Sequence, residues 1–146
     1  VGAISAVGVG LLAVADTSFA HNSGGALAHV INASDTQVAL ARCTPVSNGG
    51  LLATDRDLVA VSGGSLVMAA SQVSLNWGAT LALTSLVGAS SVTGSTFGLN
   101  FNSASGPLIS VNGCAQGFQL LGSTISYNLG TYQPHTHPFH SFHAFH

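Results

Sequence analysis

The sequence predicts an all-β fold, specifically an antiparallel β-sandwich of the jelly-roll or immunoglobulin-like kind. Three observations lead to this prediction. Short apolar runs recur at intervals of about 8–12 residues, clusters of Gly, Ser and Asn separate them, and no run has convincing helix caps. We expect residues 21–130 to form the sandwich, with an apolar segment at 1–20 before it and a tail at 131–146 after it.

Several runs alternate between apolar and other residues, as a half-buried strand does. Phe97, Leu99 and Phe101 alternate with Gly and Asn, and Gly63-Gly64 stands between two apolar runs like a two-residue hairpin turn. Gly-Gly pairs recur at unequal intervals, which argues against a solenoid repeat. The expected strands are Ala26–Asn32, Thr36–Cys43, Asp57–Ser62, Ser65–Ala70, Gln72–Asn76, Thr80–Leu86, Thr96–Phe101, Leu108–Val111, Gly117–Leu121 and Thr124–Leu129.

The composition is nearly free of charge. Charged residues make up 4% of the chain, against about 25% in an ordinary domain. Two arginines cannot neutralise a phosphate backbone, which excludes nucleic acid as a partner. Four Asp and no Glu leave little for carboxylate chemistry, so we expect no enzyme, no small-molecule substrate and no required cofactor. Low net charge promotes association, which favours copies of the same chain as the partner.

The segment 1–20 is apolar, with Asp16 as its first charge. One interpretation is the remnant of a signal peptide that ends at a small-residue site. A membrane helix is a weaker alternative, because the run is short and rich in Gly. The preferred interpretation is a pilus-like donor strand that completes a neighbour's open sheet. Its predicted assembly residues are Ile4, Val7, Val9, Leu11 and Val14.

Cys43 and Cys114 fit neither a zinc nor a redox motif, so the prediction is one disulfide in an oxidising compartment. Two buried free thiols in a cytosolic protein are the alternative. Asn32-Ala33-Ser34 is a weak glycosylation sequon. These features indicate an extracellular or cell-surface protein that meets a membrane only during export.

The C-terminal tail is rich in His and Phe. Pro134 and Pro138 favour an extended path for it. Clustered imidazoles bind Cu, Ni or Zn, so the tail is a candidate metal site without accompanying thiolates or carboxylates. A packing interface formed by the phenylalanines and a frayed end are the alternatives. The candidate metal ligands are His135, His137, His140, His143 and His146.

Two functions follow from these features. The first is a structural subunit of an extracellular filament or surface assembly, a homopolymer that self-associates by strand exchange of the segment 1–20. The alternative is a secreted metal-binding protein that uses the His tail. A carbohydrate-binding or enzymatic sandwich ranks last, because the sequence shows neither an aromatic platform nor an acid pair.

Overall fold

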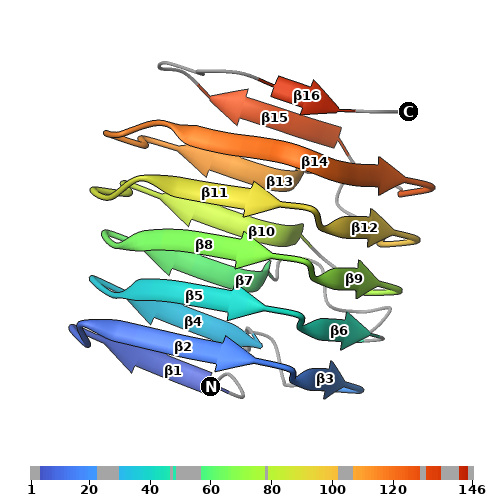
Figure 1. Cartoon of the computed structure of the whole chain (residues 1–146), viewed down its shortest axis with the longest axis horizontal. Coiled ribbons are helices and arrows are strands. Elements are labelled where there is room, and N and C mark those ends of the chain that lie inside the picture. The colour runs from blue at the N-terminus through green and yellow to red at the C-terminus, as the bar shows by residue number, and fades with distance from the viewer. Residues whose placement is uncertain are drawn as a thin grey trace.

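The chain forms a parallel β-solenoid. A computed structural model describes residues 4–22, 30–46, 48, 57–77, 79–101, 107–128, 131–135 and 142–144. Successive coils stack on one another from the N-terminus to the C-terminus (Figure 1). All pairs of strands in these residues run parallel, so the predicted antiparallel sandwich is wrong.

Each complete coil holds three strands. The first coil comprises β1 (Ile4–Val7), β2 (Leu11–Ala15) and β3 (Ser18–Ala20). The second comprises β4 (Ile31–Ser34), β5 (Gln37–Ala41) and β6 (Thr44–Val46), and the third β7 (Asp57–Ser62), β8 (Ser65–Ala69) and β9 (Gln72–Ser74). The later strands are β10 (Ala79–Thr84), β11 (Ser90–Thr93), β12 (Thr96–Gly98), β13 (Pro107–Asn112), β14 (Phe118–Ser126), β15 (Thr131–His135) and β16 (Phe142–Ala144).

Equivalent strands of successive coils build three faces. The first face runs β1-β4-β7-β10-β13-β15, the second β2-β5-β8-β11-β14 with β16 on β14, and the third β3-β6-β9-β12-β14. The long strand β14 belongs to both the second and the third face (Figure 1). The predicted hairpin at Gly63-Gly64 is a corner between β7 and β8, which lie on different faces.

The core lies inside the coils, because alternate side chains of every strand point inward. On the first face one inward column contains Ile31, Val59, Leu81 and Ile109, each at most 1% exposed. Aliphatic and aromatic residues fill the equivalent columns of the other faces, including Leu40, Met68, Val92 and Leu120 on the second and Phe19, Val73 and Phe97 on the third.

Corners join the strands, and the residue at each described corner has a positive φ. Few residues other than glycine adopt this conformation readily, so the corners are costly positions. The first corner, before the second face, has Gly8, Asp35, Gly63, Ser85 and Gly113. The second corner has Asp16, Arg42, Ala70, Gly94 and Gly122, and the third has His21, Leu75, Leu99 and Tyr127.

A ladder of buried asparagines follows the third corner. Asn76 Nδ2 donates to Asn100 Oδ1 at 2.9 Å, and Asn48 Nδ2 donates to Asn76 Oδ1 at 2.9 Å. The backbone N–H of each rung also donates to the Oδ1 of the next. Asn22 and Asn128 are the outer rungs. The ladder therefore fixes the stacking of the coils with hydrogen bonds inside the core.

The segment 1–20 is part of this stack. Its residues 4–20 form β1, β2 and β3, which pair in register with β4, β5 and β6 of the same chain. The donor-strand prediction is therefore wrong: the alternation of Val7, Val9 and Leu11 reflects a coil of the chain's own solenoid. The described residues contain no helix long and apolar enough to cross a membrane.

Candidate assembly surface

Among the described strands, those of the first coil lie at the N-terminal end of the stack. Strands β1, β2 and β3 each pair with one strand of the second coil, and no described strand lies on their other side. Half of the backbone hydrogen-bonding groups of such edge strands face outward and are free to pair with another strand. The N-terminal end of the stack therefore presents three strand edges together (Figure 1).

Apolar side chains at this edge are less covered than their equivalents deeper in the stack. Ile4, Leu12 and Val14 point inward and are only half-buried, because no described coil lies beneath them. Their partners in the second coil, Ile31 and Val38, are each 1% exposed. Within the described residues, the core is thus less covered at this end of the stack.

The first corner of the first coil adds an exposed apolar group. Val7, Val9 and Leu11 are 71%, 46% and 56% exposed, respectively. Together with Ile4 and Val14 they are the five predicted assembly residues. The structure gathers all five on the first coil, although as parts of folded strands and a corner instead of a free arm.

The described strands of the first coil lack the residues that usually protect an edge. Natural edge strands carry lysines, prolines or bulges that prevent pairing with another molecule. Strands β1, β2 and β3 contain neither a charged residue nor a proline. The opposite end of the first face differs, because β15 contains Pro134, which has no N–H to donate to a further strand. The two ends of the stack therefore differ in their capacity to pair.

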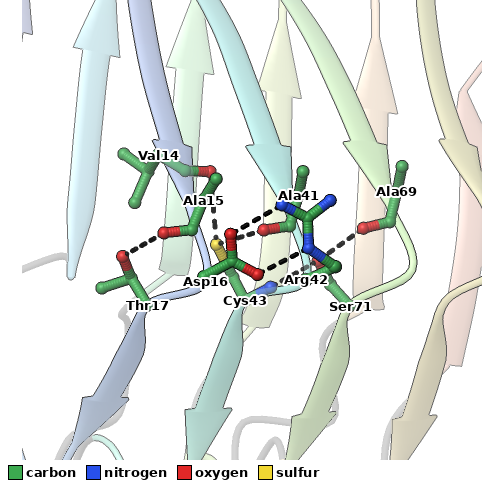
Figure 2. Close-up of polar contacts among 9 residues, drawn as sticks. All are labelled: Val14, Ala15, Asp16, Thr17, Ala41, Arg42, Cys43, Ala69 and Ser71. Carbon is green, nitrogen blue, oxygen red and sulfur yellow. Dashed lines mark hydrogen bonds and ion pairs between the residues drawn. The ribbon is translucent and has the colours of Figure 1, made fainter.

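Asp16, the charged residue of the first coil, forms an ion pair with Arg42 of the second coil. At the second corner Arg42 Nε and Nη2 donate to Asp16 Oδ1 and Oδ2 at 2.5 and 2.6 Å, a bidentate pair that joins the first coil to the second (Figure 2). Both side chains are well exposed. Hydrogen bonds from Arg42 hold the pKa of Asp16 below its ordinary value, and the same contact raises the pKa of Arg42.

This ion pair predicts a small acid sensitivity. A carboxylate with a lowered pKa in the folded state contributes stability above its unfolded pKa and loses it as pH falls through the folded pKa. We expect the urea midpoint of the native protein to fall more steeply between about pH 5 and pH 2 than that of Asp16→Asn. Arg42→Gln should flatten the profile equally, and the double variant should add nothing; additive effects would contradict the pairing.

A row of hydroxyl side chains reinforces the second corner. The backbone N–H of Cys43 donates to Ser71 Oγ at 3.1 Å (Figure 2). In the following coils Ser71 donates in the same way to Ser95, and Ser95 to Ser123. Cys43 occupies the position of these serines in the second coil, so its place in the fold is that of a buried corner residue.

The structure does not bring the two cysteines together. Both are buried free thiols. Cys43 Sγ lies 3.5 Å from the carbonyl oxygen of Val14 at the second corner, whereas Cys114 follows Gly113 at the first corner of a later coil. Burial raises the pKa of Cys114, whose thiol donates to the carbonyl oxygen of Gly117 at 3.0 Å. The disulfide and the oxidising compartment stay predictions.

The structure describes only part of the His tail. His135 ends β15 on the first face, and His143 lies in β16 on the second face. His137, His140 and His146 lie outside the described residues. No group of three or more His, Cys, Asp or Glu side chains able to hold a metal occurs in the described ranges. Binding of Cu, Ni or Zn by the tail stays a prediction.

A shallow hollow of about 230 Å³ lies over the second face. Val67, Ser91 and Gln119 contribute to its lining, which has no His, Cys, Asp or Glu side chain. The hollow thus offers hydrogen bonds but no general acid or base. Asn32 is exposed on β4, and its glycosylation also stays a prediction.

Comparisons of the chain with protein-family models, with curated proteins and with solved structures found no match. Its function is therefore inferred from its own geometry.

Proposed function

We propose that this chain is a non-enzymatic structural unit of an extracellular or cell-surface assembly, in which copies of the chain associate through their first coils. The observation that supports this proposal is the edge of β1, β2 and β3, which no described strand covers on its outer side and beside which Val7, Val9 and Leu11 are exposed. No described strand leaves its own solenoid, so the proposed contact is an edge-to-edge pairing of intact coils.

Pairing of two first coils satisfies the backbone N–H and C=O groups that face outward on β1, β2 and β3. Main-chain hydrogen bonds across the contact each contribute about 0.5–1.5 kcal/mol. Burial of Val7, Val9 and Leu11 adds about 25 cal/mol for each Å² of apolar surface removed from water. The near absence of charge, 4% of residues, removes the repulsion that would oppose the approach of two copies.

The difference between the two ends favours a symmetric contact. In a first-coil-to-first-coil pair, related by a two-fold axis, each edge meets an identical edge with antiparallel strands. A head-to-tail contact would instead place β1 against β15, where Pro134 has no N–H to offer. The symmetric pair is therefore the building unit that we expect.

The proposal is tested by sedimentation of the native protein over a wide concentration range. We expect reversible association, and we expect Val7→Lys with Leu11→Lys to abolish it, because a two-fold contact brings the added positive charges of the two copies close together. Val67→Lys with Val87→Lys is the matched control, since these residues are similarly exposed, at 46% and 63%, but lie outside the first coil.

The control variant should associate like the native protein, and far-ultraviolet circular dichroism should show the same β content for all three. Association that survives the lysines at residues 7 and 11 would contradict the assigned edge. A native protein that stays a single monomeric species at millimolar concentration would overturn the proposal itself.

A further inference from the structure

The third corner carries large apolar residues where the other two corners do not. Leu75, Leu99 and Tyr127 have φ values of 57°, 58° and 53°. A positive φ is strained for any residue with a large side chain, and glycine would adopt it freely. The equivalent positions of the first and second corners hold glycine, alanine, serine, aspartate or arginine. Three successive coils therefore retain strain in order to place an apolar side chain at this corner.

The strain gives no benefit to the core. Leu75, Leu99 and Tyr127 are 42%, 47% and 85% exposed, so they form an apolar ridge along the outside of the stack. Beyond the ladder asparagines, Trp77 and Phe101 pack against each other, with ring centroids 5.0 Å apart, and both are half-buried. Strained residues cluster where a protein uses them for binding or catalysis.

A neutral polar surface lies directly beside the apolar ridge. It is the outer side of the third face, where Gln72, Thr96 and Thr124 occupy one row of β9, β12 and β14 by strand register. All three side chains are exposed. Ser74 and Ser126, each next to a ridge residue, add two further hydroxyl groups. Neighbouring strands are about 4.7–4.9 Å apart, so polar row and apolar ridge run in parallel along the stack.

The chemistry of this surface selects a neutral and extended ligand. The third face presents amide and hydroxyl groups beside apolar and aromatic side chains, and β9, β12 and β14 contain no charged residue. A second copy of the chain is a poor occupant, because a stable protein interface buries about 800 Å² on each partner. The ridge, with three side chains, is too small to supply that area. A sugar polymer offers hydroxyl groups at its edges and apolar faces on its rings.

We propose that the apolar ridge and the polar row of the third face bind a neutral polysaccharide that lies along the solenoid axis. Ring faces contact Leu75, Leu99 and Tyr127, and sugar hydroxyl groups exchange hydrogen bonds with Gln72 and the threonines. This binding is independent of the association of first coils. That contact involves the edge of β1, β2 and β3 and the first corner, whereas the apolar ridge lies at the third corner of later coils. The aromatic group that the sequence did not reveal is Tyr127, which the fold leaves exposed.

Affinity electrophoresis of the native protein tests the proposal, with hydroxyethyl cellulose, dextran or mannan in the gel and alginate as an acidic comparison. We expect retardation by at least one neutral polymer and none by alginate. Leu75→Gly with Leu99→Gly and Tyr127→Gly should weaken binding at least about tenfold, while the relief of strain should keep or raise the melting temperature. Ala70→Gly with Ser85→Gly relieves strain at the other corners and should bind like the native protein.

A second variant, Thr96→Val with Thr124→Val, removes hydroxyl groups from the polar row but keeps the ridge. It should also weaken retardation while leaving the circular dichroism unchanged. Failure of all three neutral polymers to retard the native protein would overturn the proposal, and so would equal retardation of the ridge variant. Loss of self-association in the ridge variant would show instead that the ridge is a contact between copies.

Discussion

Replacement of Asn76 by alanine should lower the free energy of unfolding by about 4 kcal/mol. The side chain is 1% exposed and takes part in the ladder in both directions. Its Oδ1 accepts from the backbone N–H and the Nδ2 of Asn48, and its Nδ2 donates to Asn100 and to the carbonyl oxygen of Pro45. Alanine leaves these buried partners unsatisfied, at a cost of about 1–3 kcal/mol each before relaxation.

Denaturant titration measures this effect, and the chain supplies two comparisons. Asn22 is the outermost rung, only half-buried, and donates to Asn48 without a described rung below it. Asn22→Ala should therefore cost about 1 kcal/mol. Asn112 lies exposed on β13, and Asn112→Ala should cost less than about 0.5 kcal/mol. Equal losses at residues 76 and 112 would show that the ladder does not fix the stack.

Many of the strands could be predicted from the sequence, but their pairing could not. The strand Asp57–Ser62 was predicted with the bounds that β7 has, and Ser65–Ala70 differs from β8 by one residue. Alternation of apolar and polar residues is the same in parallel and antiparallel sheets. A glycine pair between two strands fits a hairpin and a solenoid corner equally well, so Gly63-Gly64 could not distinguish them.

The repeat was hidden by the variable length of the coils. Successive ladder asparagines are separated by 26, 28, 24 and 28 residues, so no fixed period exists. A signal was nevertheless present: an apolar residue stands three positions before each ladder asparagine. The five segments that share it are Phe19–Asn22, Pro45–Asn48, Val73–Asn76, Phe97–Asn100 and Ile125–Asn128.

The candidate surfaces were predictable to different degrees. The apolar character of Val7, Val9 and Leu11 predicts an assembly role, which stays a prediction, but it does not reveal that these residues belong to a folded coil. The apolar ridge was not predictable, because Leu99 alternates with Phe97 and Phe101 and was expected to lie on the same side of one strand as they do. Its exposure follows from the corner at this position, which the alternation of Phe97, Leu99 and Phe101 does not reveal.

Replacement of Gly64 by alanine should destabilise the protein by at least about 3 kcal/mol. A Cβ atom at this position would lie 1.9 Å from the carbonyl oxygen of Thr36 and 2.7 Å from its backbone nitrogen. These are backbone atoms of the coil below, so no rotation of a side chain relieves the clash. Relief requires separation of β5 from β8 where the backbone N–H of Ser65 donates to Thr36.

The fall in melting temperature should be about 10 °C, at roughly 2–4 °C per kcal/mol for a chain of this size. Alanine substitutions at two other glycines serve as controls, which distinguish the steric clash at residue 64 from the strain of a positive φ. A Cβ atom at Gly94 meets no atom within 4 Å, but φ there is +54°, so Gly94→Ala should cost only about 1 kcal/mol of strain. Gly10 has neither a close neighbour nor a positive φ, and Gly10→Ala should be nearly neutral. Equal melting temperatures for the variants at residues 64 and 10 would mean that the second and third coils do not approach closely at Gly64, and the parallel register of β5 and β8 would then be incorrect.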